Sequence, residues 1–103
     1  MVDVGQKEVS VREATASGRV ETTADVLAAL RAGTIPKGDV VAAARLAGIM
    51  AVKRTPDLIP LCHPIGLDSC EVSFETVDDH TVRIEAAVSV HARTGVEMEA
   101  LTA

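Results

Sequence analysis

The clearest pattern in the chain is an alternation of apolar and polar residues over positions 70–76 and again over 82–90. A period of two places alternate side chains on the same face of a β-strand. The polar run Asp78-Asp79-His80 between the two segments is typical of a tight turn. The sequence therefore predicts an antiparallel hairpin. Its core-facing residues are expected to be Cys70, Val72, Phe74, Thr76, Val82, Ile84, Ala86, Val88 and Val90.

Two helices are expected before this hairpin. Thr23 suits the N-cap of a helix that runs to Ala32, because its hydroxyl can accept a hydrogen bond from an early free N–H, and Gly33 is the expected stop. An Ala-rich helix is expected to follow Asp39 and to end near Lys53-Arg54. The acidic start and basic end of this second helix match the two poles of the helix dipole.

The remaining segments are shorter. Positions 8–12 and 19–22 alternate in polarity and predict two short strands at a sheet edge, on either side of Ser17-Gly18. Prolines at 56, 60 and 64 predict an irregular segment over 54–64, which is unusually apolar for a surface loop. A last helix is expected to start at Thr94-Gly95. The 103 residues thus predict one α+β domain, 1–103, with an antiparallel sheet and helices packed on one face.

Composition narrows the classes of function. Hydrophobic residues make up 48% of the chain, with one Phe and no Trp or Tyr, so the core must be aliphatic. Aliphatic surfaces of this kind are often completed by oligomerisation. The formal net charge of -5 argues against nucleic acid or a membrane surface as the main partner. The scarcity of aromatic residues also removes the stacking platforms that single-stranded nucleic acid requires.

The amino end and the cysteines indicate a cytoplasmic protein. Met1-Val2-Asp3 does not resemble a secretion signal, and no apolar run approaches the length of a membrane span. The two cysteines, Cys62 and Cys70, are expected to be reduced thiols. A zinc site that combined them with His63 and His80 would lack any familiar ligand spacing. We expect no metal site and no cofactor; magnesium that accompanies a substrate is not demanded by any residue.

Four cations lie between positions 37 and 54, namely Lys37, Arg45, Lys53 and Arg54. If they converge on one cleft they suit a polyphosphate, since Lys supplies a point charge and Arg a bidentate fork. The alternative is that Lys53 and Arg54 complement a helix dipole and Lys37 is solvated. His63 also has two interpretations: a phosphate donor or proton carrier near neutral pH, or a packed residue bonded to backbone.

Glu97 and Glu99 are the carboxylates of interest near the end of the chain, with Met98 between them. In a helix the two side chains point roughly 200° apart and cannot form one carboxylate pair. In an extended segment they would share a face, and one could orient a sugar or base while the other pairs with a cation. Ordinary acidic residues in a first helical turn are the alternative. Cys62 and His63 are excluded as a nucleophile pair, because adjacent residues in extended chain point to opposite sides.

Longer strings of sequence carry a more specific signal. They are Met1-Val-Asp-Val4, Lys37-Gly-Asp39, Ala47-Gly-Ile49, Lys53-Arg-Thr55, Asp57-Leu-Ile-Pro-Leu-Cys-His-Pro64 and Thr94-Gly-Val-Glu-Met-Glu-Ala-Leu-Thr-Ala103. In this order and approximate spacing they resemble the cyclic pyranopterin monophosphate synthase family, also called the molybdenum-cofactor biosynthesis C proteins. The resemblance covers the whole chain and implies a ferredoxin-like α+β fold.

The resemblance also implies an activity and an assembly. Such enzymes convert 3′,8-cyclo-7,8-dihydroguanosine triphosphate to cyclic pyranopterin monophosphate and release pyrophosphate. They are hexamers, built as trimers of dimers, with sites between subunits. By motif match, the expected catalytic residues are Lys37, Lys53, His63 and Glu97. The expected substrate-binding residues are Leu61, Cys62, His63, Met98 and Glu99.

One departure from the family opens two alternatives. Family members continue past the last string with the rest of a helix, a further strand and a basic tail, which carry an active-site aspartate and further lysines. A chain that ends at Ala103 is expected to lack that part of the fold and of the site. The first alternative is a truncated, inactive homologue that binds nucleoside triphosphate or co-assembles with an intact subunit. The second is a small structural or interaction domain.

Overall fold

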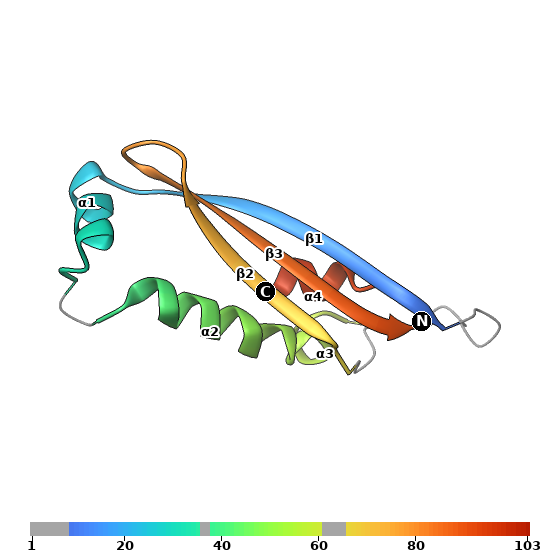
Figure 1. The fold of residues 1–103 in the computed structure, drawn as a ribbon. Helices are drawn as coiled ribbons and strands as arrows, with labels where there is room; N and C mark the ends of the chain where they lie inside the picture. Colours follow the sequence, from blue (N-terminus) through green and yellow to red (C-terminus); the bar gives the residue numbers. More distant parts are fainter. Residues whose placement is uncertain (1–8, 36–37, 61–65) are drawn as a thin grey trace.

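The computed structural model describes residues 9–35, 38–60 and 66–103. This part of the chain forms three strands and four helices, and Figure 1 shows them as a long sheet with helices against it. The elements are β1 (Ser10–Glu21), α1 (Ala24–Ala32), α2 (Val40–Val52), α3 (Thr55–Leu58), β2 (Ser69–Thr76), β3 (Thr81–Ala92) and α4 (Glu97–Thr102).

The strands form one antiparallel sheet in the order β1-β3-β2. Strand β3 pairs with β2 from Val82 to Ser89 and with β1 along its whole length. The predicted hairpin is therefore confirmed. β3 lies between two strands that the helices connect, which is the split βαβ arrangement of ferredoxin-like folds. The α+β class predicted from the sequence is also confirmed.

Strand β1 corrects the expectation of two short strands. It is one strand of twelve residues and crosses Ser17-Gly18 without a turn. Gly18 pairs with Ile84, and a side chain at this glycine would meet nothing within 4 Å, so the glycine fits the ladder as an ordinary strand residue. The neighbouring strand β3 supplies a continuous partner for β1, and this long-range pairing overrides the local turn signal. The expected position at a sheet edge is confirmed.

The core lies on one face of the sheet. Cross-strand pairs bring Cys70 opposite Val88 and Val72 opposite Ala86, as the period-two pattern predicted. Helix α2 packs against β2, and α4 packs against β1, β3 and α2, so the helices cover this face (Figure 1). The buried core cluster consists of Val52, Val88, Val90, Val96 and Ala100.

The ends of the first two helices follow the predicted signals. The Thr23 hydroxyl accepts a hydrogen bond of 3.2 Å from the Val26 amide, and Gly33 ends α1 with a φ of 70°. This left-handed conformation carries little steric penalty for glycine, which has no Cβ. Asp39 caps α2 through a 3.0 Å bond from the Ala42 amide, and Lys53 follows its last helical residue.

Two later boundaries differ from expectation. Residues 55–58, expected to be irregular, form the one-turn helix α3, with Pro56 at its start where the missing N–H costs nothing. Thr55 is completely buried, and its hydroxyl donates a 2.8 Å hydrogen bond to the Val52 carbonyl. The last helix begins at Glu97 and not at Thr94-Gly95, because the apolar Val96 is buried at its N-cap.

Two contacts fix helix α2 against strand β2. A Cβ at Gly48 would lie 3.0 Å from a methyl group of Val72, so the glycine permits the close approach. Arg45 spans the other side: its Nε donates a 3.0 Å hydrogen bond to the Val72 carbonyl, and its guanidinium carbon lies 5.8 Å from the centre of the Phe74 ring. These contacts hold the helix that ends at Lys53.

The molecule is elongated, with extents of 53 × 23 × 22 Å and a radius of gyration of 16.2 Å. A compact domain of this length would have a radius of about 13 Å. At the far end from α4, an apolar hollow of about 210 Å³ separates α1 and the start of α2 from the sheet. Within the described residues, no helix is long and apolar enough to cross a membrane.

Candidate functional site

Helix α4 places its two glutamates in different environments. Glu99 is buried, with 5% of its surface exposed, whereas Glu97 is exposed. Because both residues are helical, the helix interpretation of their spacing is the correct one, and they do not share a face. The Glu97 carboxylate folds back over Gly95, where a Cβ would collide with it. Met98, between them, is 44% exposed.

The burial of Glu99 is a consequence of the core beneath it. Val96, the N-cap residue of α4, and Ala100, within the helix, are packed into the core cluster with Val88 and Val90 of β3. These two anchors hold the intervening turn of α4 against the sheet, so the Glu99 side chain is carried into the protein. A carboxylate accepts hydrogen bonds, so this position is suited to a ligand or partner that supplies donors.

The cations at the end of α2 lie close to this helix in the fold. Lys53 and Arg54 are exposed residues between α2 and α3, and both α2 and α3 pack against α4. The buried Thr55 hydroxyl bond fixes the backbone directly after them. The arrangement brings positive charge from one helix junction to the same end of the molecule as the α4 glutamates. An anionic ligand with polar ring atoms suits such a combination of charges.

Arg45 is not part of this group. Its guanidinium is committed to the Val72 carbonyl and the Phe74 ring, further along α2. Because these contacts tie the helix to the sheet, Arg45 has a structural role here and does not join the cations at the α2–α3 junction. The suggestion that it helps to bind phosphate is not supported by its position.

Four of the predicted site residues lie outside the described part of the structure: Lys37, Leu61, Cys62 and His63. The convergence of Lys37, Lys53 and His63 on one triphosphate therefore stays a prediction. The flanks of the second segment are described. Before it, the Ile59 amide donates to the Thr55 carbonyl; after it, the Asp68 amide donates to Ser89 O at 3.0 Å, and its carboxylate bonds to His91.

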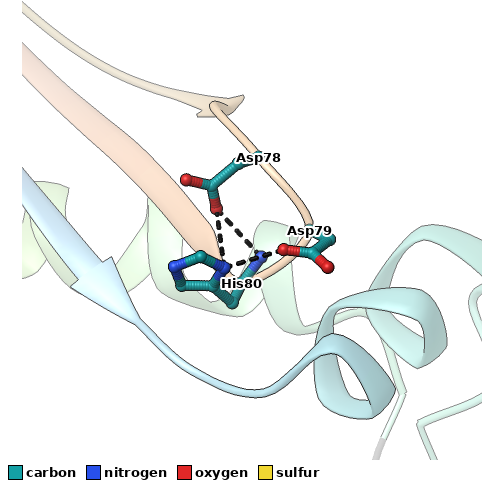
Figure 2. Close-up of side chains that lie close together, drawn as sticks. All are labelled: Asp78, Asp79 and His80. Carbon is teal, nitrogen blue, oxygen red and sulfur yellow. Dashed lines mark hydrogen bonds and ion pairs between the residues drawn. The ribbon is translucent and has the colours of Figure 1, made fainter.

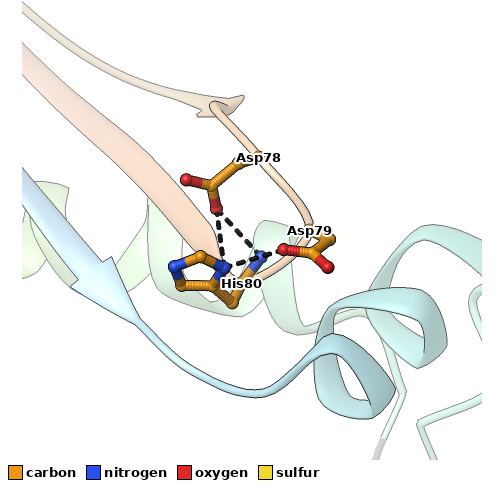
Figure 3. Close-up of polar contacts among 3 residues, drawn as sticks. All are labelled: Asp78, Asp79 and His80. Carbon is orange, nitrogen blue, oxygen red and sulfur yellow. Dashed lines mark hydrogen bonds and ion pairs between the residues drawn. The ribbon is translucent and has the colours of Figure 1, made fainter.

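A second group of polar side chains, at the turn between β2 and β3, was read from the sequence only as a turn. Figure 2 shows Asp78, Asp79 and His80 gathered there, and all three are exposed. His80 Nδ1 lies 2.7 Å from an Asp79 oxygen and 3.3 Å from an Asp78 oxygen (Figure 3). The His80 amide also donates a 3.0 Å bond to Asp78. Their proximity follows from adjacency in sequence and requires no tertiary packing.

Contacts within the turn shift the pKa values of two side chains, Asp78 and His80. The hydrogen bond from the His80 amide lowers the pKa of Asp78 below its ordinary value. The hydrogen bond to Asp79, with the charge of Asp78, raises the pKa of His80. These contacts account for the grouping without a metal ion. Cys70 is a free thiol whose pKa is raised by burial, and it lies at the opposite end of the hairpin from His80.

Taken together, these features define an α+β domain of the split βαβ type with a buried acidic residue and a cationic helix junction at one end of its sheet. Comparison with known proteins gives the family. The model described as the MoaC family matches residues 1–103, and the chain belongs to that family.

Three curated relatives, each named cyclic pyranopterin monophosphate synthase, illustrate the similarity. The Streptomyces griseus protein is 57% identical over 103 residues, which are all of this chain and 58% of the relative. The Desulfitobacterium hafniense protein is 52% identical over the whole chain and 63% of its own length. The Roseiflexus protein is 57% identical over 104 aligned residues and 66% of its length. The chain thus spans about six-tenths of the length of these relatives.

Proposed function

We propose that the chain takes part in molybdenum cofactor biosynthesis as a cyclic pyranopterin monophosphate synthase. The reaction converts 3′,8-cyclo-7,8-dihydroguanosine triphosphate to cyclic pyranopterin monophosphate and releases pyrophosphate. One observation carries the proposal: the similarity to proteins of that name extends over all 103 residues at more than half identity. The charges at the α4 end of the sheet suit such a substrate, which combines a triphosphate with a polar ring system.

The proposal assigns the cations to the triphosphate. Lys53 is exposed at the end of α2 and free to reach an anion; Lys37 and His63 are placed beside it by the resemblance alone. Release of pyrophosphate transfers negative charge to the leaving group. Fixed cations at that position stabilise the developing charge without solvent reorganisation. His63 is assigned a hydrogen bond to a phosphate or to the sugar.

The acidic helix is assigned to the other end of the substrate. A buried carboxylate at Glu99 can accept hydrogen bonds from the N–H groups of a pterin or guanine ring. Glu97 is exposed and lies two residues before Glu99 in the same helix. It is assigned either a proton transfer or a contact with the ribose. Met98 presents an apolar surface between them, and Leu61 and Cys62 are assigned to line the same site.

The proposal extends to assembly and location. A hexamer made as a trimer of dimers, with sites between subunits, would cover apolar residues that this chain leaves exposed, such as Leu46, Met50 and Leu101. Its partners are then further copies of the chain and a small-molecule substrate. Reduced thiols, represented by Cys70, fit the cytoplasm, where we place the reaction.

Turnover of the authentic cyclised substrate to a fluorescent pterin is the direct test. The wild-type chain should form product and release pyrophosphate in equal amounts. Lys53→Ala should lose about 10²-fold or more of the rate, as is typical when a charge that stabilises the transition state is removed. Arg31→Ala, which removes an exposed positive charge from helix α1, is the matched control. A wild-type chain that binds the substrate and never releases pyrophosphate would contradict the proposal.

A second candidate function is binding of the nucleotide, or assembly with an intact subunit, without turnover by this chain. Exposed apolar residues such as Leu46 and Leu101 favour assembly with a further subunit. Mixing the chain with a full-length relative and measuring mass by light scattering tests this. A mixed oligomer with inactive 103-residue subunits would favour the second candidate over the first.

A further inference from the structure

The face of the sheet that points away from the helices is open in the described part of the chain. Helices α2 and α4 pack against the other face, as Figure 1 shows. Side chains at odd-numbered positions of the three strands lie on the open face, and those of β1 and β2 are exposed. Sheets stack at a separation of about 10 Å, which small side chains permit. Near the middle of the open face small side chains predominate, namely Thr15, Ser17, Ser73, Ala87 and Ser89.

Strand β1 carries opposite charges at the two ends of this face. Glu13 lies opposite Ser89 toward the α4 end, and Arg19 lies opposite Arg83 toward the turn end. The six residues between the two charges correspond to about 20 Å along the strand. Among the described residues, neither Glu13 nor Arg19 forms an ion pair within 4.0 Å. Each charge is therefore available to a partner molecule.

The surroundings of Arg19 favour a carboxylate from outside the chain. Like charges directly opposite each other on one face of a sheet are destabilising, and Arg19 faces Arg83 in this way. Arg83 is compensated within the chain, because its Nη1 lies 2.9 Å from Oε2 of Glu85 and it also faces Glu75 of β2. Arg19, on the edge strand, has no such partner in the part of the chain that the structure describes. An added carboxylate would relieve the repulsion.

The same face offers carboxylates at its other end. A hollow of about 250 Å³ is lined by Glu13 on β1 and by Glu71 on β2, with Ala87 and Ser89 of β3 between them. No lysine or arginine lines it. A guanidinium matches such a site, because its planar fork can donate two hydrogen bonds to one carboxylate. One face thus carries both an uncompensated arginine and a site that an arginine fits.

We propose that the open face binds a second copy of this chain, with Arg19 of each copy in the hollow beside Glu13 and Glu71 of the other. A two-fold axis that crosses the strands near Ala16 places position 19 of one copy over position 13 of the other. The same operation repeats the contact on the far side of the axis, so the ion pair forms twice. The interface uses the face away from the helices, and it does not depend on the proposed reaction.

Exchange of the two charges tests this interface, with sedimentation equilibrium as the measurement. The wild-type chain should contain an even number of copies. Arg19→Glu and Glu13→Arg should each weaken the association at least about ten-fold, because like charges then meet across the axis. The double variant, with both substitutions, should recover wild-type association. Arg19→Glu also places a carboxylate opposite Arg83, so its unfolding temperature should not fall, which separates lost association from lost stability.

The matched control is Arg31→Glu, the same charge change at an exposed position of α1, which should leave the association within about two-fold of wild type. Circular dichroism establishes that each variant is folded; if Glu13→Arg does not fold, Arg19→Glu and the double variant carry the test. Folded single variants that associate as tightly as wild type would overturn the inference and leave the proposed reaction untouched. A wild-type chain that stays monomeric would also overturn it, even if the face bound an added arginine-rich peptide.

Discussion

The two ends of the long sheet both carry acidic residues, but they hold them in different ways. At the α4 end, Glu99 is buried because Val96 and Ala100 anchor its helix in the core. At the turn end, Asp78 and Asp79 surround His80 in full contact with solvent. The first arrangement depends on contacts between distant parts of the chain, and the second on three consecutive residues.

This difference distinguishes a candidate binding site, at the α4 end, from a grouping of consecutive residues, at the turn. The side-chain oxygen and nitrogen atoms of Asp78, Asp79 and His80 lie close together, so the turn is the more conspicuous of the two groups. Its polar groups satisfy one another and remain hydrated, so little is gained when a ligand replaces the water. Glu99 is instead held by tertiary packing, on the helix that packs against α2 and α3, the two elements that flank Lys53 and Arg54. A ligand that carries both an anionic group and hydrogen-bond donors can contact both groups, which favours binding at the α4 end.

The largest expected effect contrasts one acidic residue from each end. Glu99→Gln should reduce turnover of the cyclised substrate by about 10²-fold, because the charge-assisted hydrogen bonds from the ring N–H groups are lost. The amide keeps the size of the side chain and removes its charge. Asp79→Asn, the control at the turn end, should retain the wild-type rate. Equal rates for the two variants in a fluorescent pterin assay would place the chemistry elsewhere.

Stability should also differ between the ends. Val90→Ala removes two methyl groups from the buried cluster and should lower the free energy of unfolding by about 2 kcal/mol. Val20→Ala is the same change at the turn end, on a residue that is 50% exposed and lines the apolar hollow. It should cost less than about 0.5 kcal/mol. Urea unfolding of both variants measures the contrast, and equal losses would contradict it.

A smaller effect concerns helix α1, which belongs to the turn end. Thr23→Ala removes the hydroxyl that caps the helix and should destabilise it locally by about 1 kcal/mol. Amide exchange of residues 27–32 should become about five-fold faster, while exchange in β3 stays unchanged. Uniformly faster exchange over both elements would mean that α1 unfolds only together with the core.

The smallest effect is the pH response of the turn. The raised pKa of His80 means that its contribution to stability is complete below the ordinary histidine value of 6.5 and is lost as pH rises through the folded-state pKa. The lowered pKa of Asp78 gives the opposite sign: its contribution is present above 3.8 and is lost as pH falls through its folded-state pKa. The contacts of the turn are thus strongest between these two values.

A nuclear magnetic resonance titration of His80 measures this response. In Asp79→Asn the pKa of His80 should fall toward 6.5, because Asp79 supplies the largest of the effects that raise it. Glu21→Gln should change it less, since Glu21 acts only through its charge and is the weakest cause. An unchanged pKa in Asp79→Asn would show that the side-chain bond in Figure 3 does not persist in solution.

Sequence patterns predicted those parts of the fold that local physics decides. The alternation around Val72 and Val88 fixed the buried face of the hairpin, and the caps at Thr23 and Asp39 gave two helix starts. The single long strand β1 was not predicted, because the turn signal at Ser17-Gly18 yields to pairing with β3. Pairing between distant segments is a tertiary property that a local window does not contain.

The candidate site was predictable to a different degree. The sequence singled out Lys53, Glu97 and Glu99, but it left open whether the two glutamates lie in a helix and could not tell which of them is buried. Arg45 was grouped with the phosphate cations, although its contact with Phe74 is visible only after folding.

The central claim is that triphosphate binds at the α4 end of the sheet. A map of backbone amide shifts during titration of the ¹⁵N-labelled chain with the GTP analogue tests it most directly. The account predicts the largest changes at Lys53 and Glu97–Glu99, with residues 77–81 unchanged. Changes confined to 77–81 and helix α1, with the α4 end silent, would contradict it.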